Sequence, residues 1–365
     1  MTLKWIKPLL VHIFEGANIA VIALLWLAAA VTYLSPEHYP RLTLISLAFP
    51  IFLFTDIAFI LFWIIFKVKR TWIPIVGLAA CFSFVRDYMP LNIPSEPTPS
   101  SLSVLTFNTH GYGGAEATAD DGSNMIVKYL ANRGDDIICL QETYSQAYTQ
   151  ALSDSLAPEG YNEATVKGLA LFTRLPIISF EELTYPTLNN SGFLAYLLWQ
   201  TDTILLINNH FESNHFSPEL RQKYVDALKQ TASASSRNAA DSLIDEVKPL
   251  LRLMAEAAPM RAAQTDLIDS IVTAWLPRPV ILCGDFNDTP VSYTHRVLTR
   301  HLTSAFRQSG NGLGRTFRER GFPVRIDHIL FSGQHWSSHK TQVDQSMTLS
   351  DHSPISTILS PNSGI

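Results

Sequence analysis

Apolar residues dominate the first part of the chain almost without interruption. Three apolar stretches lie at about 17–34, 42–66 and 72–85. The first two are long enough to cross a hydrocarbon core of roughly 30 Å, whereas the third is short and contains Pro74 and Gly77. The third stretch therefore fits either a third span or a re-entrant or interfacial segment. We predict a membrane region at residues 1–89, with about three transmembrane helices.

Basic residues near the ends of these stretches predict the orientation. Lys4 and Lys7 precede the first stretch, and Lys67, Lys69 and Arg70 follow the second. Because loops on the cytoplasmic side carry an excess of Lys and Arg, both clusters are expected in the cytoplasm. With three spans, the rest of the chain emerges on the extracytoplasmic side of a membrane that we expect to be a bacterial inner membrane. With two spans, it stays in the cytoplasm.

The pattern changes after residue 89. Residues 90–100 contain four prolines, which fit neither a helix nor a central strand, so we predict a semi-rigid linker. Beyond the linker, short apolar runs alternate with polar and turn-forming residues, as expected for buried strands in an α+β domain at residues 101–360. The predicted strands lie at 103–107, 136–140, 204–207 and 280–283, with shorter runs before Asp327 and Asp351.

Polar side chains follow these runs at the points where the strands are expected to end. One such residue alone is normally a turn or surface residue, but six strand ends that supply carboxylate, amide and imidazole groups indicate a shared site. Carboxylate and amide oxygens suit Mg²⁺ or Mn²⁺, and no cluster of Cys and His has zinc spacing. In chain order, these residues are Asn108, Glu142, His210, Asp285, Asn287, Asp327, Asp351 and His352.

A helical pattern interrupts the domain at about residues 214–257. Ser217 and Pro218 form a typical helix start, and apolar residues recur at helical spacing between 243 and 254. Pro249 predicts a kink or a split in the second helix. Two roles remain open for this insertion: packing against the rest of the domain, or forming a lid or membrane-facing element near the site.

The charge is divided unevenly along the chain. Of 27 Lys and Arg and 32 Asp and Glu, seven and four lie in residues 1–95, so residues 96–365 carry a formal charge of −8. A protein that grips duplex DNA normally presents an excess of basic side chains, so this balance argues against tight, extended nucleic-acid binding. Cys81, Cys139 and Cys283 lie in apolar runs and are expected to be buried thiols.

Four short motifs together resemble those of the endonuclease/exonuclease/phosphatase superfamily, which includes deoxyribonucleases, abasic-site endonucleases, inositol polyphosphate 5-phosphatases and sphingomyelinases. The motifs are Leu140-Gln-Glu142, Gly284-Asp-Phe-Asn287, Arg325-Ile-Asp327 and Ser350-Asp-His352, and the resemblance covers roughly residues 101–360. It implies a four-layer α/β/β/α sandwich of two mainly antiparallel sheets, which agrees with the α+β pattern.

The resemblance also implies roles for the polar residues. Glu142 matches the principal metal carboxylate of the family, with Asn108 beside it and Asp351 completing the acidic cluster around Mg²⁺ or Mn²⁺. His352 matches the histidine at the scissile phosphate, acting as a base or as a charged stabiliser, and Asp327 matches its partner. One departure concerns His110, which stands where some nucleases of the family carry an acidic residue.

The remaining implied roles concern the phosphate itself. Asp285 and Asn287 are two residues apart, so on an extended segment both side chains point to the same face. The resemblance implies that Asp285 handles the attacking water or the leaving group, and that Asn287 holds a phosphoryl oxygen. His210 matches a position that contacts the phosphate in relatives.

The sequence therefore predicts a membrane-anchored, Mg²⁺-dependent phosphoesterase that hydrolyses a phosphodiester or phosphomonoester. The alternatives are a nuclease acting on DNA or RNA and a lipid head-group phosphodiesterase. An inositol polyphosphate phosphatase is disfavoured because Asn287-Asp-Thr-Pro290 lacks the basic and aromatic residues of that family. A non-enzymatic binding module is disfavoured because every expected catalytic position is filled. The expected partners are a phosphate-ester substrate and the lipid bilayer, with no obligate protein partner evident.

Overall fold

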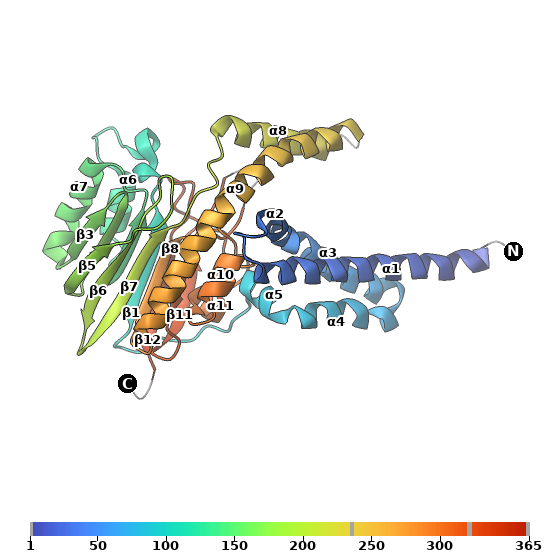
Figure 1. Cartoon of the computed structure of the whole chain (residues 1–365), viewed down its shortest axis with the longest axis horizontal. Coiled ribbons are helices and arrows are strands. Elements are labelled where there is room, and N and C mark those ends of the chain that lie inside the picture. The colour runs from blue at the N-terminus through green and yellow to red at the C-terminus, as the bar shows by residue number, and fades with distance from the viewer. Residues whose placement is uncertain (1–2, 234–236, 320–322, 363–365) are drawn as a thin grey trace.

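The computed structural model describes residues 3–233, 237–319 and 323–362. Two six-stranded sheets pack face to face, and helices cover their outer faces (Figure 1). The order in the first sheet is β11 (Trp336–Val343), β12 (Ile355–Pro361), β1 (Leu102–Asn108), β2 (Ile137–Gln141), β4 (Leu169–Thr173) and β3 (Asn162–Val166). The order in the second sheet is β5 (Ile177–Glu182), β6 (Gly192–Trp199), β7 (Asp202–His210), β8 (Val280–Asp285), β10 (Asp327–Phe331) and β9 (Thr303–Ser304).

Each sheet is antiparallel except for one central parallel pair. These pairs are β1 with β2 and β7 with β8. The predicted sandwich of two mainly antiparallel sheets is therefore confirmed. Because successive side chains of a strand point to opposite faces of the sheet, each central strand contributes side chains to two apolar layers. On β1, Leu102 and Val104 enter the core between the sheets, while Leu105 and Phe107 enter the core under the outer helices.

The outer helices differ between the two sheets. On the first sheet, α6 (Met125–Ala131) and α7 (Gln146–Leu156) cover the outer core. On the second sheet, the C-terminal part of α9 (Arg237–Trp275) supplies Ile268 and Val272 to the corresponding core. Helix α8 (Pro218–Ser233) packs against α9, α10 (Tyr293–Leu298) also contacts α9, and α11 (Ala305–Ser309) contributes Phe306 to the core between the sheets.

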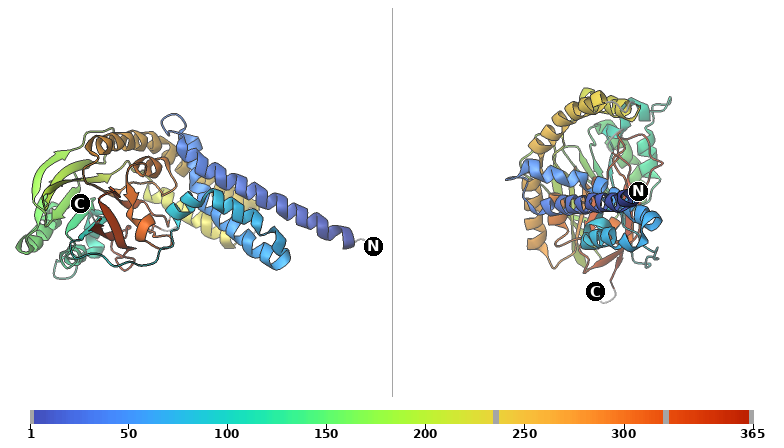
Figure 2. Two further views of the ribbon diagram at one scale, coloured as in Figure 1. Left: turned by 90° about the horizontal axis from the view of Figure 1, so that it is seen from below. Right: turned by 90° about the vertical axis from the view of Figure 1, so that its right-hand side faces the viewer.

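The N-terminal helices project from one side of the sandwich (Figures 1 and 2). Two helical stretches, Leu9–Tyr33 and Pro40–Phe66, are long and apolar enough to cross a membrane. A third crossing is available if α4 and α5, which meet at a 72° bend, form one broken span. The bounds are α1 (Leu3–Ala30), α2 (Pro40–Thr43), α3 (Phe49–Phe66), α4 (Trp72–Ala80) and α5 (Phe82–Tyr88).

A buried polar contact links two of these helices. The Nδ2 of Asn18 in α1 donates to Oδ1 of Asp56 in α3 at 2.8 Å, and both side chains are fully buried. A carboxyl group facing lipid is costly, whereas one that points into the bundle and accepts a hydrogen bond is tolerated. Asp56 therefore lies in the bundle interior, away from lipid.

The N-terminal helices are also attached to the sandwich by specific contacts. Arg307 in α11 forms an ion pair with Asp87 at 2.6 Å, and the Arg325 guanidinium donates to the backbone oxygen of the same Asp87. Arg296 in α10 donates to the backbone oxygen of Thr32 at 2.8 Å. These contacts fix the sandwich against one end of the helix bundle.

Three local predictions need correction. Asp327 begins strand β10 instead of ending a strand, and Asp351 follows a loop. The site is preserved because β10 is antiparallel to β8, so the start of β10 lies beside Asp285 at the end of β8. Of the kink or split expected at Pro249, the split is absent, since α9 continues through Pro249 and Pro259 to Trp275.

Candidate active site

The ends of the central strands meet at one edge of the sandwich and bring the predicted residues together. In the parallel pair of β7 and β8, His210 lies opposite Asp285, and in the antiparallel pair of β8 and β10, Asp327 lies opposite Asp285. Asn108 ends β1 on the other sheet and reaches across to the second sheet, where its Nδ2 donates to Oδ2 of Asp285 at 3.1 Å. The two sheets thus contribute to a single site.

Two of the eight predicted site residues have a left-handed backbone. The φ angle is 55° at Glu142 and 49° at Asn287. Such values are uncommon outside glycine and are found often at functional sites, where surrounding contacts hold the strain. At Asn287, the backbone N–H donates to Oδ1 of Asp285 at 2.8 Å, and Nδ2 donates to the backbone oxygen of Phe211 at 3.0 Å.

The close approach of β8 to β7 near the site requires a glycine. Gly284 has a φ of 139°, and a Cβ at this position would lie 1.8 Å from the backbone oxygen of Asn209 on the neighbouring strand. Any side chain would therefore push β7 and β8 apart. The glycine allows the two strands to deliver His210 and Asp285 side by side.

Asn108 links the two carboxylates nearest to it. Besides its bond to Asp285, its Nδ2 donates to Oε1 of Glu142 at 3.0 Å. The hydroxyl of Ser350 donates to the backbone oxygen of Asn108 at 2.8 Å and accepts the N–H of His352 at 3.0 Å. These bonds tie the loop that carries Asp351 and His352 to strand β1.

His352 is held by Asp327. Its Nδ1 lies 2.8 Å from Oδ2 of Asp327, which leaves Nε2 directed at Oδ2 of Asp285 at 3.6 Å. Burial alone would lower the pKa of His352, but the charges of Asp327 and Asp285 and the hydrogen bond outweigh burial and raise the pKa to about 10. Burial, and then repulsion from Asp327, raises the pKa of Asp285.

His210 approaches the same carboxylates from strand β7. Its Nε2 lies 3.6 Å from Oδ2 of Asp285 and 3.9 Å from Oε1 of Glu142. The side chain is almost fully buried, so a bound anion would meet an imidazole that water does not screen. The hydroxyl of Ser213 is a second neighbour of this nitrogen, at 3.4 Å.

His110 takes part in the site although the sequence predicted no role for it. Its Nδ1 lies 3.5 Å from Oε2 of Glu142 and 3.4 Å from Oδ1 of Asp351, so an imidazole bridges the two carboxylates. The hydrogen bond to Glu142 raises the pKa of His110 against the effect of burial. In turn, burial alone would raise the pKa of Glu142, but His110, His210 and Asn108 together lower it to about 2.

Two groups of acidic residues at this edge are suited to a metal ion. Asp285, Asp327 and His352 form a buried group whose ligand atoms lie within 4.8 Å of one another, close enough to hold a metal. The second group contains Glu142 and Asp351, for which the sequence predicts metal binding with Asn108. Oδ1 of Asp351 is buried and has no hydrogen-bond partner among the described residues, which fits an oxygen that faces a cation.

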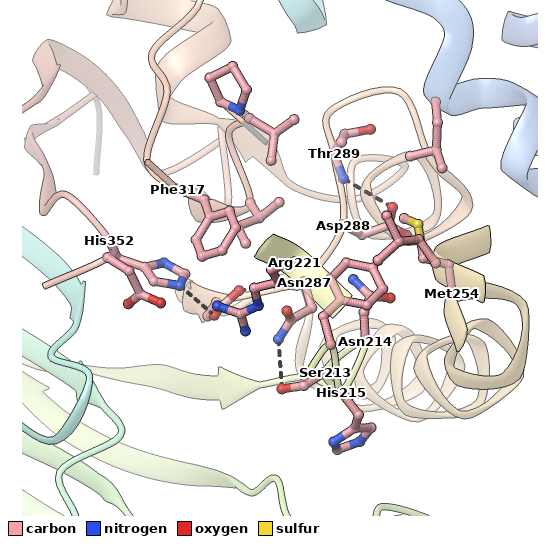
Figure 3. Close-up of a pocket in the computed structure, with 18 of the residues that line it drawn as sticks. Ser213, Asn214, His215, Arg221, Met254, Asn287, Asp288, Thr289, Phe317 and His352 are labelled. Atoms are coloured by element: carbon pink, nitrogen blue, oxygen red, sulfur yellow. Dashed lines mark hydrogen bonds and ion pairs between the residues drawn. The ribbon is translucent and has the colours of Figure 1, made fainter. Parts of the chain in front are cut away.

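The predicted residues border a cavity of about 540 Å³ (Figure 3). Of the eight, Asn108 and Asp327 lie behind its wall, whereas the other six line it. The cavity also contains residues that the sequence did not single out, among them Arg221 and Asp288. Arg221 comes from α8, and its sequence neighbourhood resembles an ordinary surface helix, so only the packing of that helix over the site shows its position.

Comparison with known proteins gives two regions of similarity. Residues 105–352, more than half of the chain, match the model of the Endonuclease/Exonuclease/phosphatase family. Residues 11–88 match a model described as a domain of unknown function. No curated protein matches the chain.

Solved structures resemble the sandwich. The human Nocturnin catalytic domain with bound sulfate is 16% identical. The match covers 73% of this chain and 97% of the Nocturnin chain, with a TM-score of 0.50. A family member from Bacteroides thetaiotaomicron is 16% identical over 73% of this chain and 98% of its own, with a TM-score of 0.48. Sphingomyelinase C from Streptomyces griseocarneus is 17% identical. The match covers 72% of this chain and 100% of the sphingomyelinase chain, with a TM-score of 0.46. The likeness to the Nocturnin domain shows the fold alone.

Proposed function

This chain belongs to the endonuclease/exonuclease/phosphatase family of hydrolases that act on phosphoester bonds, and from that premise we propose that it is a membrane-anchored, divalent-metal-dependent phosphoesterase. The observation that carries the proposal is the buried pair of His352 and Asp327, which faces Asp285 at the wall of the cavity. The substrate is a phosphodiester or phosphomonoester, and water attacks the phosphorus in line with the leaving oxygen.

Glu142 and Asp351, with Asn108 beside them, are the proposed holders of Mg²⁺ or Mn²⁺. The buried Oδ1 of Asp351, which accepts no hydrogen bond from the described residues and has His110 Nδ1 3.4 Å away, and the low pKa of Glu142 support this assignment, because a metal ligand must be ionised. A bound divalent ion would neutralise negative charge on the phosphoryl oxygens. Asn108 keeps Glu142 in place through its amide hydrogen bond. The neighbouring group of Asp285, Asp327 and His352 could hold a metal as well.

The remaining residues act on the phosphate and on the water. With a raised pKa, His352 carries its proton at neutral pH, so it stabilises charge on a phosphoryl oxygen through Nε2, and Asp327 fixes its orientation. Asp285 lies beside it with a raised pKa, which suits a group that accepts a proton from water. The amide of Asn287 and the imidazole of His210 hold further phosphoryl oxygens.

The test uses the full chain, purified in a nonionic detergent, with bis-p-nitrophenyl phosphate as substrate. We expect hydrolysis that is lost with EDTA and restored with Mg²⁺, and losses of at least about 100-fold in Glu142→Ala and in His352→Ala. Glu163→Ala, an exposed acidic position on β3, is the matched control and should keep wild-type activity. Activity that survives EDTA or either site substitution would overturn the assignment.

The arrangement of the helices supports an extracytoplasmic catalytic domain. Arg70 forms an ion pair with Glu15 in α1, whereas Thr32, at the other end of the span, contacts the sandwich. At 1.5 Å per residue, the 17 residues between them correspond to about 26 Å, close to the thickness of a hydrocarbon core. This distance supports our proposal that the basic cluster with Lys67 and Lys69 and the sandwich lie on opposite sides of the membrane, with the cluster in the cytoplasm.

Cysteine labelling tests this orientation. The three native cysteines are buried, so a membrane-impermeant maleimide should react mainly with an introduced thiol. In spheroplasts, Ser100→Cys should be labelled directly, and Lys69→Cys only after lysis. Both positions are exposed, so neither depends on local opening of the fold. The reverse pattern would place the catalytic domain in the cytoplasm.

A further inference from the structure

The cavity at the candidate active site has a polar end and an apolar end. The polar end contains Asp285, Asn287 and His352, whose roles are proposed above. The opposite end is built by two parts of the chain that the phosphate chemistry does not use. Leu47 and Pro50 come from the start of the membrane helix α3 and the turn before it. Helix α9 contributes its apolar face, namely Val247, Leu250, Leu251 and Met254.

The position of α9 explains why this end is apolar. Helix α9 packs against α2 and the turn that precedes α3, so its inner face meets the beginning of the membrane-spanning part. Its outer face carries exposed charged residues, among them Lys248 and Arg252. In Figure 1, α8 and the first half of α9 extend beyond the sandwich in the same direction as α1. The apolar end of the cavity therefore lies on the side of the molecule where the bilayer begins.

Arg221 lies between the two ends. Figure 3 shows its guanidinium beside Asn287, with His352 on one side and Met254 on the other. Its Nε is buried and has no hydrogen-bond partner among the described residues, and its Nη1 lies 3.5 Å from Glu319. A buried guanidinium nitrogen without a partner is costly, so this position suits an anionic group that enters the cavity.

We propose that the cavity binds a membrane lipid, with the phosphoester at His352 and Asp285 and a hydrocarbon chain in the apolar end between α9 and the start of α3. This proposal rests on the phosphoesterase function and adds the class of substrate. A water-soluble phosphate ester would leave the apolar wall exposed to water, whereas an alkyl chain covers it. A nucleic acid fits less well, because residues 96–365 carry a formal charge of −8 and, among the described residues, no basic side chain lines the apolar end of the cavity.

A homologous series of chromogenic substrates tests the proposal. The substrates are alkyl p-nitrophenyl phosphates with chains of about two, eight and fourteen carbons, assayed with the full chain at one detergent concentration. Burial of each methylene in the cavity should strengthen binding by about fourfold. We expect KM to fall at least about tenfold from the shortest to the longest ester, because several methylenes can be buried.

Two substitutions separate cavity binding from partition of the substrate into micelles. Val247→Trp and Met254→Trp fill the apolar end, and each should remove most of the dependence of KM on chain length. Ile178→Trp is the matched control, since Ile178 is an exposed aliphatic residue on β5 outside the cavity, and it should keep the full dependence.

The outcomes distinguish the two proposals. Hydrolysis of the ethyl ester with a KM that does not depend on chain length would overturn the lipid proposal and leave the phosphoesterase standing. The same conclusion would follow if the control substitution altered the dependence as strongly as Val247→Trp, or if plasmid DNA were cleaved with a higher kcat/KM than the long-chain ester. Failure to hydrolyse any ester would overturn the phosphoesterase function, and the lipid proposal with it.

Discussion

His352 and Asp327 are 25 positions apart in the sequence, yet Nδ1 of His352 lies 2.8 Å from Oδ2 of Asp327, and both side chains are buried. The antiparallel pairing of β10 with β8 puts Asp327 at the active edge, and the Ser350 hydroxyl holds the backbone of His352 above it. The hydrogen bond fixes both the ring orientation and the nitrogen that faces the cavity, and this nitrogen is the one that points to Asp285.

Replacement of Asp327 tests whether this orientation matters for catalysis. In Asp327→Asn, the side chain keeps its size but loses the charge that holds the imidazolium. We expect kcat on bis-p-nitrophenyl phosphate to fall by about 100-fold or more, with a smaller change in KM, because the histidine acts mainly on charge in the transition state. Asp136→Asn, outside the cavity, is the control. An unchanged kcat would show that His352 needs no anionic partner.

His110 gives a second prediction, which concerns the metal. Its Nδ1 lies 3.5 Å from Glu142 and 3.4 Å from Asp351, so the imidazole occupies the space between the proposed ligands. His110→Asp replaces the imidazole with a third carboxylate, so the Mg²⁺ concentration for half-maximal activity should fall by at least about threefold. The measurement is a Mg²⁺ titration of hydrolysis, with His110→Ala expected to lie between the two. A higher Mg²⁺ requirement in His110→Asp would argue against metal binding between Glu142 and Asp351.

The sequence motifs predict a large part of this site because most of its residues follow strands directly. The run that ends at Asn108 and the one before Asp285 carry the signal in their own apolar pattern. Asp327 is different, because it starts its strand and reaches the site only through the antiparallel pairing with β8. Its assignment therefore came from the family resemblance, and the local pattern alone led to the wrong end of the strand.

The apolar end of the cavity, in contrast to the polar site, is not predicted by the sequence. Val247 and Met254 have the helical spacing that predicts an amphipathic helix, but that spacing gives no partner for the apolar face. The partner is the start of α3 with the turn before it, about 200 residues earlier in the chain, and the contact between them depends on how the helix bundle docks on the sandwich. Long-range packing of this kind leaves no local signal in either segment.

Gly284 gives a prediction about stability. A Cβ there would meet the backbone oxygen of Asn209 at 1.8 Å, so Gly284→Ala must separate two paired strands in the core. We expect a loss of more than about 4 kcal/mol, which exceeds the range of ordinary substitutions, or a failure to fold. Gly160→Ala is the matched control, because Gly160 also has a positive φ, of 83°, but nothing lies within 4 Å of the added Cβ. Its cost should be only about 1–2 kcal/mol. Comparable melting temperatures for the two variants would show that β7 and β8 are less tightly packed than they are here.

The last prediction concerns pH and a histidine outside the candidate site. His295 in α10 is buried, and its ring lies 5.1 Å from the ring of His328. Burial, together with the charges of Arg325 and Arg307, lowers the pKa of His295 to about 3. In the unfolded chain, a histidine has a pKa of about 6.5, so between these values the unfolded state binds a proton that the folded state does not. The contribution of His295 to stability is therefore present at neutral pH and is lost as the pH falls below about 6.5, by about 2 kcal/mol at pH 5.

His295→Phe keeps a ring of similar size and removes the titration. Between pH 7 and pH 5, the free energy of unfolding of this variant should therefore decrease by about 2 kcal/mol less than that of the wild type. The measurement is urea unfolding of the full chain in detergent, followed by tryptophan fluorescence, at both pH values. His301→Phe, at an exposed position, should decrease as much as the wild type. Because each comparison is made within one variant, any loss of packing caused by the Phe ring cancels, and only the proton-linked part remains. Equal decreases in the wild type and in His295→Phe would mean that this imidazole is protonated, or reached by water, in the folded protein.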